Sequence, residues 1–120
     1  MRVGPLKLKA QIFCGNEAAM GPGKADLLET IDRTGSISAA GREMGMSYRK
    51  TWLLVDSMNR CWREKLVEAT AGGGQSRGAR VTYAGRQVLA AYRKLEARMA
   101  GTVGDELDIL SVMLRDLPHA

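Results

Sequence analysis

Residues 34–52 read TGSISAAGREMGMSYRKTW, and this stretch decides the fold of the 120-residue chain. It joins a short helix signal to a longer one through a sharp turn. Small residues at Ala39, Ala40 and Gly41 allow two helices to approach closely, and Gly45 suits a turn that needs a positive φ. The pattern predicts a helix-turn-helix. An ordinary helical hairpin with a solvated basic corner is the alternative.

Serines indicate where the two helices begin. Ser38 is placed to cap the first helix and Ser47 to cap the second. The first turn of the second helix then carries Tyr48, Arg49 and Lys50. In DNA-binding helix-turn-helix motifs these positions face base edges and phosphates in the major groove.

The residues before this motif predict a strand, a connector and a supporting helix. Residues 6–13 alternate apolar and polar side chains, which is the period of a half-buried strand. Residues 15–23 are rich in glycine and read as a connector. A helix is expected over 24–34, ended by Gly35, with three core residues. The side chains expected to face inward are Leu6, Leu8, Ala10 and Ile12 from the strand and Leu27, Leu28 and Ile31 from the helix.

The second motif helix is expected to continue for about 15 residues and to pack one broad apolar face inward. Trp52, Val55, Asn59 and Trp62 recur three or four apart on this face. Trp52 has a position from which it could stack on a base. At that spacing, however, packing in the core is the expectation for it.

Two short strands, 66–70 and 79–82, flank a glycine-rich loop and predict a β-hairpin. After a helix-turn-helix such a hairpin is a wing, with Arg77 at its tip and Arg80 on the return strand able to reach phosphates or the minor groove. The alternative is a surface loop whose arginines only aid solubility. We expect the N-terminal strand to pair with one edge of this hairpin.

The last region predicts two helices with apolar stripes. Thr82 or Tyr83 opens the first helix, and Asp105 is placed to cap the second. These stripes can fold back on the core, but a second copy of the chain is the expected partner. We therefore expect a winged helix-turn-helix domain over 1–82 and a helical dimerisation arm over 83–120, in a fold that is mainly α with a small β-sheet. The stripes are formed by Val88, Leu89, Tyr92, Leu95 and Met99, and by Leu107, Leu110, Leu114 and Leu117.

Composition points to a polyanionic partner. The net charge is +5, and between Arg42 and Arg86 nine basic residues stand against four acidic ones, an excess equal to that of the whole chain. No apolar run approaches a membrane span, and no signal peptide is visible, so a cytoplasmic protein is expected. We expect Cys14 and Cys61 to be small buried hydrophobic residues. The sequence shows no pattern of a metal or cofactor site.

The motif resembles the DNA-binding domain of ModE-type molybdate-responsive transcriptional regulators over roughly residues 6–100. The residues that carry the resemblance are GSISAA at 35–40 and MGMSYRKTWLLVD at 44–56, with the glycine-rich wing and TYAG at 82–85. The resemblance implies a winged helix-turn-helix that dimerises through its long C-terminal helix and regulates molybdenum genes. Full-length members carry a molybdate-binding region for which 120 residues leave no room, so direct molybdate sensing by this chain is not expected.

Together these observations predict a dimeric regulator that binds double-stranded DNA sequence-specifically. A protein-interaction module with little specific DNA binding is the alternative. An enzyme finds no support, because no nucleophile pair, metal cluster or phosphate loop is visible. The candidate DNA-binding residues are Ser36, Ser38, Ser47, Tyr48, Arg49, Lys50, Arg77 and Arg80.

Overall fold

The computed structural model describes residues 2–3, 6–70, 78–101 and 104–120 of the chain. Within these residues the fold is mainly helical, with small two-stranded antiparallel sheets. No helix among them is long and apolar enough to span a bilayer. In chain order the elements are β1 (Arg2–Val3), β2 (Leu6–Lys7), β3 (Ile12–Cys14), β4 (Glu17–Met20), α1 (Pro22–Thr34), α2 (Ile37–Glu43), α3 (Tyr48–Cys61), β5 (Val67–Thr70), β6 (Gly78–Val81), α4 (Tyr83–Ala100) and α5 (Asp105–Met113).

The N-terminal region differs from the expected single strand. The alternation of burial over 6–13 is present, but strand structure is interrupted between Lys7 and Ile12. β3 pairs with β4 and not with the wing, so the expected pairing was wrong. The expected connector contains β4 itself, because Gly15 at φ 60° turns the chain back within two residues.

α1 forms the support behind the helix pair. Pro22 stands at its start, where the missing N–H costs nothing, and Gly35 at φ 69° ends it in the left-handed region while donating its N–H to the Ile31 carbonyl. Leu27, Leu28 and Ile31 are fully buried, as expected from the sequence.

The helix-turn-helix is built by close contact and a glycine turn. A Cβ at Gly41 would lie 2.2 Å from the Thr51 hydroxyl oxygen, so only glycine lets α2 and α3 approach this closely. Gly45 at φ 71° makes the turn. The expected cap at Ser38 was wrong, because Ser36 is the N-cap of α2 and accepts from the Ala39 N–H. Ser47 caps α3 as predicted.

α3 buries a narrower face than expected. Thr51, Val55 and Met58 are buried, whereas Trp52 is 40% exposed, so its predicted core position was wrong. The physical reason is that the small residues of α2 pack against Thr51, which turns Trp52 to the edge of the buried face. Trp62 is half-buried after α3 and donates its indole N–H to the Ala19 carbonyl at 3.0 Å.

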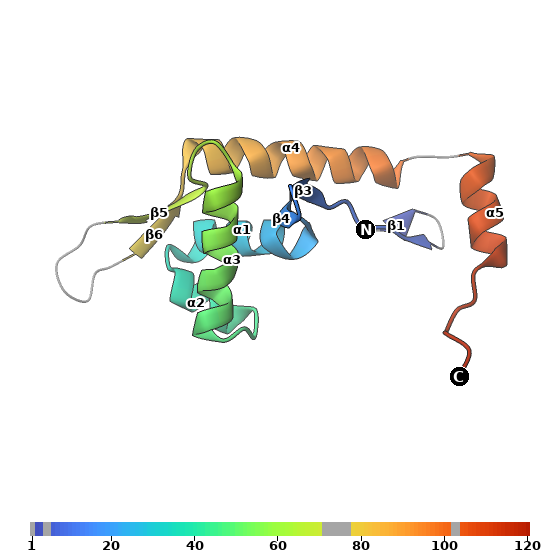
Figure 1. Cartoon of the computed structure of the whole chain (residues 1–120), viewed down its shortest axis with the longest axis horizontal. Helices are drawn as coiled ribbons and strands as arrows, with labels where there is room; N and C mark the ends of the chain where they lie inside the picture. The colour runs from blue at the N-terminus through green and yellow to red at the C-terminus, as the bar shows by residue number, and fades with distance from the viewer. Residues whose placement is uncertain (1, 4–5, 71–77, 102–103) are drawn as a thin grey trace.

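β5 and β6 form the predicted hairpin, which projects from one end of the helical body (Figure 1). Asn59 of α3 holds its base, donating to the Val67 carbonyl at 2.9 Å and accepting from the N–H groups of Leu66 and Val67. On the other strand the Ala79 N–H donates to the Gly35 carbonyl at 2.9 Å. The base of the wing is therefore hydrogen-bonded to α3, and β6 is hydrogen-bonded, nearer the loop, to the end of α1.

α4 lies along one edge of the molecule (Figure 1) and is bound to the core by residues as far along it as Arg93. Thr82 caps it, as expected from the sequence. Tyr92 is buried and donates its hydroxyl to the Ala10 carbonyl at 2.6 Å. Arg93 pairs with Asp26 and Glu29 of α1 at 2.6 and 2.7 Å. The direction of α4 is therefore fixed by α1.

α5 packs against little of the described structure. Gly104 and not Asp105 is its N-cap, so the expected cap was wrong, and no residue of α5 is buried. In Figure 1 it lies beyond the far end of α4 from the wing. Its apolar side chains are therefore exposed within the described chain, notably Ile109, Leu110, Val112 and Met113.

Candidate nucleic-acid interface

The first turn of α3 presents a basic, exposed surface. Ser47 accepts from the Lys50 N–H at 3.1 Å and thereby fixes the start of the helix. Tyr48, Arg49 and Lys50 follow, and all three are exposed. An α-helix start also leaves N–H groups without intrahelical partners, which favours an anion. This geometry suits contact with DNA phosphates and with base edges in the major groove.

Ion pairs separate the basic residues into two groups. Arg60 and Arg86 are paired with carboxylates, whereas Arg49 and Lys50 form no ion pair within the described residues. A cation already paired with a carboxylate has less to gain from a phosphate than one that faces water. Among the described residues between Arg42 and Arg86, the charge available for a polyanion therefore resides on the exposed basic residues without a carboxylate partner, namely Arg42, Arg49, Lys50, Arg63 and Lys65.

The predicted serines differ in what their hydroxyl groups already bind. Ser36 is half-buried and caps α2 by accepting from the Ala39 N–H at 3.1 Å. Ser38 is half-buried in the first turn of α2. Together with Tyr48 these two serines line one groove, so the structure brings these three predicted site residues together.

The wing contributes one described cation. Arg80 is exposed but pairs across the hairpin with Glu68, Nε to Oε1 at 2.7 Å, and the two residues are direct neighbours in the strand register. Successive residues of a strand face opposite sides, so Arg80 points away from the side on which Ala79 meets the groove. The prediction for Arg77 lies outside the described residues.

Sequence reasoning missed Trp52 as a site residue. Its ring lies 6.1 Å from that of Tyr48 with an angle of 63° between the planes, an edge-to-face arrangement. Both rings line the same groove of about 260 Å³ between α2, α3 and the wing. The signal that could have found Trp52 is the four-residue spacing of two aromatic residues directly after a capping serine.

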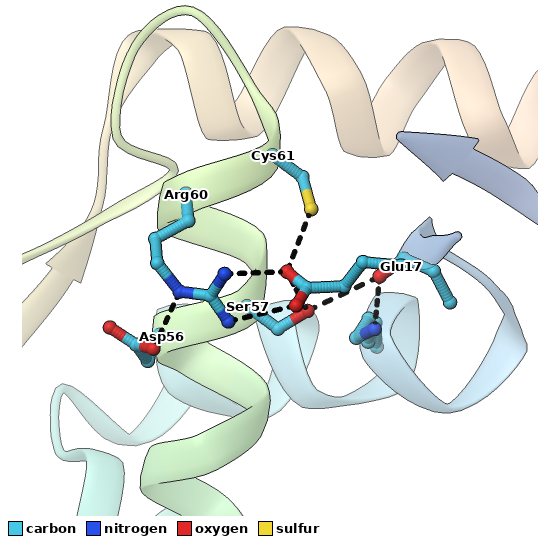
Figure 2. Close-up of polar contacts among 7 residues, drawn as sticks. Glu17, Asp56, Ser57, Arg60 and Cys61 are labelled. Carbon is cyan, nitrogen blue, oxygen red and sulfur yellow. Dashed lines mark hydrogen bonds and ion pairs between the residues drawn. The ribbon is translucent and has the colours of Figure 1, made fainter. Parts of the chain in front are cut away.

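A polar cluster fixes the other half of α3 (Figure 2). Both Glu17 carboxylate oxygens pair with Arg60 at 3.0 Å, and Arg60 also pairs with Asp56 at 2.8 Å. Cys61 donates its thiol hydrogen to Glu17 at 3.1 Å, and Ser57 donates to the Ala18 carbonyl at 3.2 Å. The expectation of two buried cysteines was wrong, since Cys14 is exposed and Cys61 half-buried.

The cluster shifts the protonation of its members. Hydrogen bonds from Cys61 and Arg60 lower the pKa of Glu17, because they stabilise the ionised carboxylate. The same carboxylate raises the pKa of the Cys61 thiol to about 11, because it accepts the thiol hydrogen and would repel a thiolate. At neutral pH the cluster therefore holds an ionised Glu17 and a protonated Cys61, which suits a structural clamp. No group of three metal-ligating side chains is present among the described residues.

Comparison with curated proteins identifies the relatives of this chain. It is 46% identical over 83 residues to "Molybdenum-pterin-binding protein MopB" of Rhodobacter capsulatus, which is 69% of this chain and 31% of that protein. It is 40% identical over 91 residues to "Molybdenum transport protein ModE" of Azotobacter vinelandii, 76% of this chain and 32% of that protein. Over the matched residues the chain is similar to ModE and to the molybdenum-pterin-binding proteins.

The similarity extends over only part of each relative. The "DNA-binding transcriptional dual regulator ModE" of Escherichia coli K12 is 32% identical over 87 residues, which is 72% of this chain and 31% of that protein. The chain thus spans about a third of the length of the curated relatives it matches. No family model matches it. The resemblance that the residues of the helix-turn-helix indicated is confirmed, and the matched relatives are by name transcriptional regulators and molybdenum-linked proteins.

Proposed function

We propose that the ModE-type domain binds double-stranded DNA sequence-specifically, as a homodimer, and regulates genes linked to molybdenum metabolism. The observation that carries the proposal is the start of α3, where a Ser47 cap presents exposed Arg49 and Lys50 with no ion pair among the described residues. The names of the curated relatives support the regulatory role. A cytoplasmic location follows from this function.

In this proposal the chain is a winged helix-turn-helix in which α3 is the recognition helix. Residues 1–82 form the DNA-binding domain and 83–120 the dimerisation arm. Phosphate contacts supply most of the affinity, and Arg49 or Lys50 reads guanine N7 and O6. Ser36, Ser38, Ser47 and Tyr48 complete the surface at α2 and α3. Arg77 and Arg80 stay the predicted wing contacts, and the charge of Arg80 is already shared with Glu68.

Selection of genomic DNA fragments by the purified chain at physiological salt tests the proposal, with and without molybdate. Enrichment of a palindromic site is expected, because two copies related by a twofold axis read two half-sites. No effect of molybdate is expected, and a molybdate effect would reveal an oxyanion site in this chain. Fragments no more enriched than bulk DNA would contradict the proposed function.

A matched pair of double variants locates the interface. Arg49→Ala with Lys50→Ala removes two exposed charges at the start of α3, and Arg63→Ala with Lys65→Ala removes two exposed charges beyond its end. Both variants have the same net charge. We expect the first to abolish site selection and the second to retain it. Equal losses in the two variants would indicate general electrostatic attraction and contradict recognition by α3.

Exposed apolar residues on α5 favour a second candidate function, a protein-interaction module. Leu110, Val112 and Met113 are 56, 85 and 79% exposed, and contiguous apolar surface of this kind marks an interaction site. Nucleic-acid binding that moderate salt abolishes would favour this candidate over the regulator. Sedimentation analysis of the chain measures whether the apolar arm is instead covered by a second copy.

A further inference from the structure

Two aromatic rings face solvent beside the basic turn of α3. Tyr48 is 66% and Trp52 40% exposed, although each ring would gain from burial. The T-shaped contact between them holds one ring against the other. Exposed aromatic side chains that are clustered and held in this way mark a contact surface.

The groove that these rings line runs between α2, α3 and the wing, and most of its lining residues are apolar or aromatic. Its walls are Ser36 and Ser38 of α2, the two rings of α3, and Ala69 and Ala79 of the wing. None of the described side chains that line it is charged. Arg49 and Lys50 share the first turn of α3 with Tyr48. A ligand that binds this end of the helix and also enters the groove therefore combines a negative charge with an apolar group.

DNA in its major groove offers that combination. The phosphates carry the charge, and the C5-methyl group of thymine is the apolar group on the floor of the groove. Cytosine, adenine and guanine present only polar edges there. Charge complementarity with Arg49 and Lys50 therefore favours DNA as the occupant, and the rings favour thymine within it.

We propose that Tyr48 and Trp52 together read thymine C5-methyl groups and so set a sequence preference that the basic residues of α3 do not set. This inference rests on the proposed DNA-binding function. It assigns a specificity role to Trp52, a residue outside the predicted site.

Replacing thymine by deoxyuridine tests the inference, because this change removes only the methyl group. Each thymine of the selected site is replaced in turn, and the affinity of the full chain is measured. At one or two positions per half-site we expect the wild type to bind the deoxyuridine duplex about 3- to 10-fold more weakly than the thymine duplex. This is the order of effect expected for burying one methyl group. Tyr48→Ala and Trp52→Ala are expected to bind the thymine and deoxyuridine duplexes equally at those positions.

Leu53→Ala is the matched control, since Leu53 is 57% exposed on the same helix and does not line the groove. It should keep the wild-type ratio. Circular dichroism verifies that each variant is folded, and the more exposed Tyr48 provides the test if Trp52→Ala is unstable. If the wild type bound every thymine and deoxyuridine duplex equally, the inference would be overturned and the proposed function would stay intact. The same conclusion would follow if both alanine variants kept the wild-type ratio of thymine to deoxyuridine affinity. Selection of no site would defeat the proposed function itself.

Discussion

The two halves of α3 carry similar charged side chains and use them differently. In the first half, Arg49 and Lys50 face solvent without ion pairs among the described residues. In the second half, Arg60 pairs with two carboxylates and Asn59 makes three hydrogen bonds to the base of the wing. The difference shows that the count of charges along a helix does not locate a binding surface. The binding surface is indicated by the charges that are not already paired with carboxylates of the protein.

The largest effect is expected where the second half of α3 holds the wing. Asn59→Ala leaves the backbone N–H groups of Leu66 and Val67 and the Val67 carbonyl without their side-chain partner. We expect the free energy of unfolding to fall by about 2 to 4 kcal/mol, because unpaired polar groups retain their full desolvation cost. Urea denaturation measures this loss.

Asn59→Asp is the matched control for that prediction. Its side chain can still accept from the two N–H groups but cannot donate to the Val67 carbonyl. An intermediate loss is expected. Faster hydrogen exchange in β5 should accompany the alanine change, and wild-type stability of Asn59→Ala would contradict the clamp.

The next effect concerns the contact that orients the first half of α3. Gly41→Ala places a Cβ 2.2 Å from the buried Thr51 hydroxyl, so α2 and α3 must move apart. We expect a loss of about 1 to 3 kcal/mol in the free energy of unfolding, which is typical of overpacking. Gly23→Ala in α1 is the control, because a Cβ there meets no atom within 4 Å. Similar stability of the two variants would show that the helix pair is loosely packed.

The DNA affinities of Arg49→Ala and Arg60→Ala test directly whether the two halves of α3 differ in DNA binding. Arg49→Ala should lower affinity for the selected site by about tenfold and relax the preference at one position. Arg60→Ala should leave the affinity within about twofold and the salt dependence unchanged, because its charge is already paired with Glu17 and Asp56. Dissociation constants over a series of salt concentrations measure both. A larger loss from Arg60→Ala would reverse the assignment of the two halves.

The smallest effect is a pH dependence in the second half. Because the pKa of Glu17 is lowered in the fold, its stabilisation is fully present above the ordinary value of 4.5 and is lost as the pH falls through the lower folded value. Glu17→Gln should therefore flatten the fall in unfolding free energy below pH 4.5. Glu64→Gln is the control, since Glu64 is exposed outside the cluster. The same pH dependence in both variants would contradict the assignment.

Local features of the helix-turn-helix were predictable from the sequence because they depend on few neighbouring residues. Gly35 and Gly45 adopt the positive φ values that their positions required, and Ser47 caps α3. The prediction of Ser38 as the cap was wrong because Ser36, two positions earlier, is an equally good capping residue. Which of them serves is decided by the preceding turn at the end of α1.

Features that depend on distant residues were not predictable. Arg60 reads as a free cation in the sequence, and its partner Glu17 lies 43 positions away on β4. Trp52 satisfies an apolar spacing, yet the packing of α2 on Thr51 places it at the edge of the groove. The hairpin of β3 and β4, by contrast, is local, and it was missed because its turn at Gly15 and the strand that follows were assigned to a glycine-rich connector. The difference between the two halves of α3 thus rests on the contacts of Arg60 and Trp52, which the sequence alone did not reveal.

Gly35 links the helices to the wing through a single peptide unit. Its carbonyl accepts from Ala79, and a side chain at Gly78 would collide with that carbonyl at 2.8 Å. The wing is thus tied to the residue that ends α1 through Ala79, while Asn59 of α3 holds its base. Any change that moves the Gly35 carbonyl is therefore transmitted to the hairpin as well as to the end of α1.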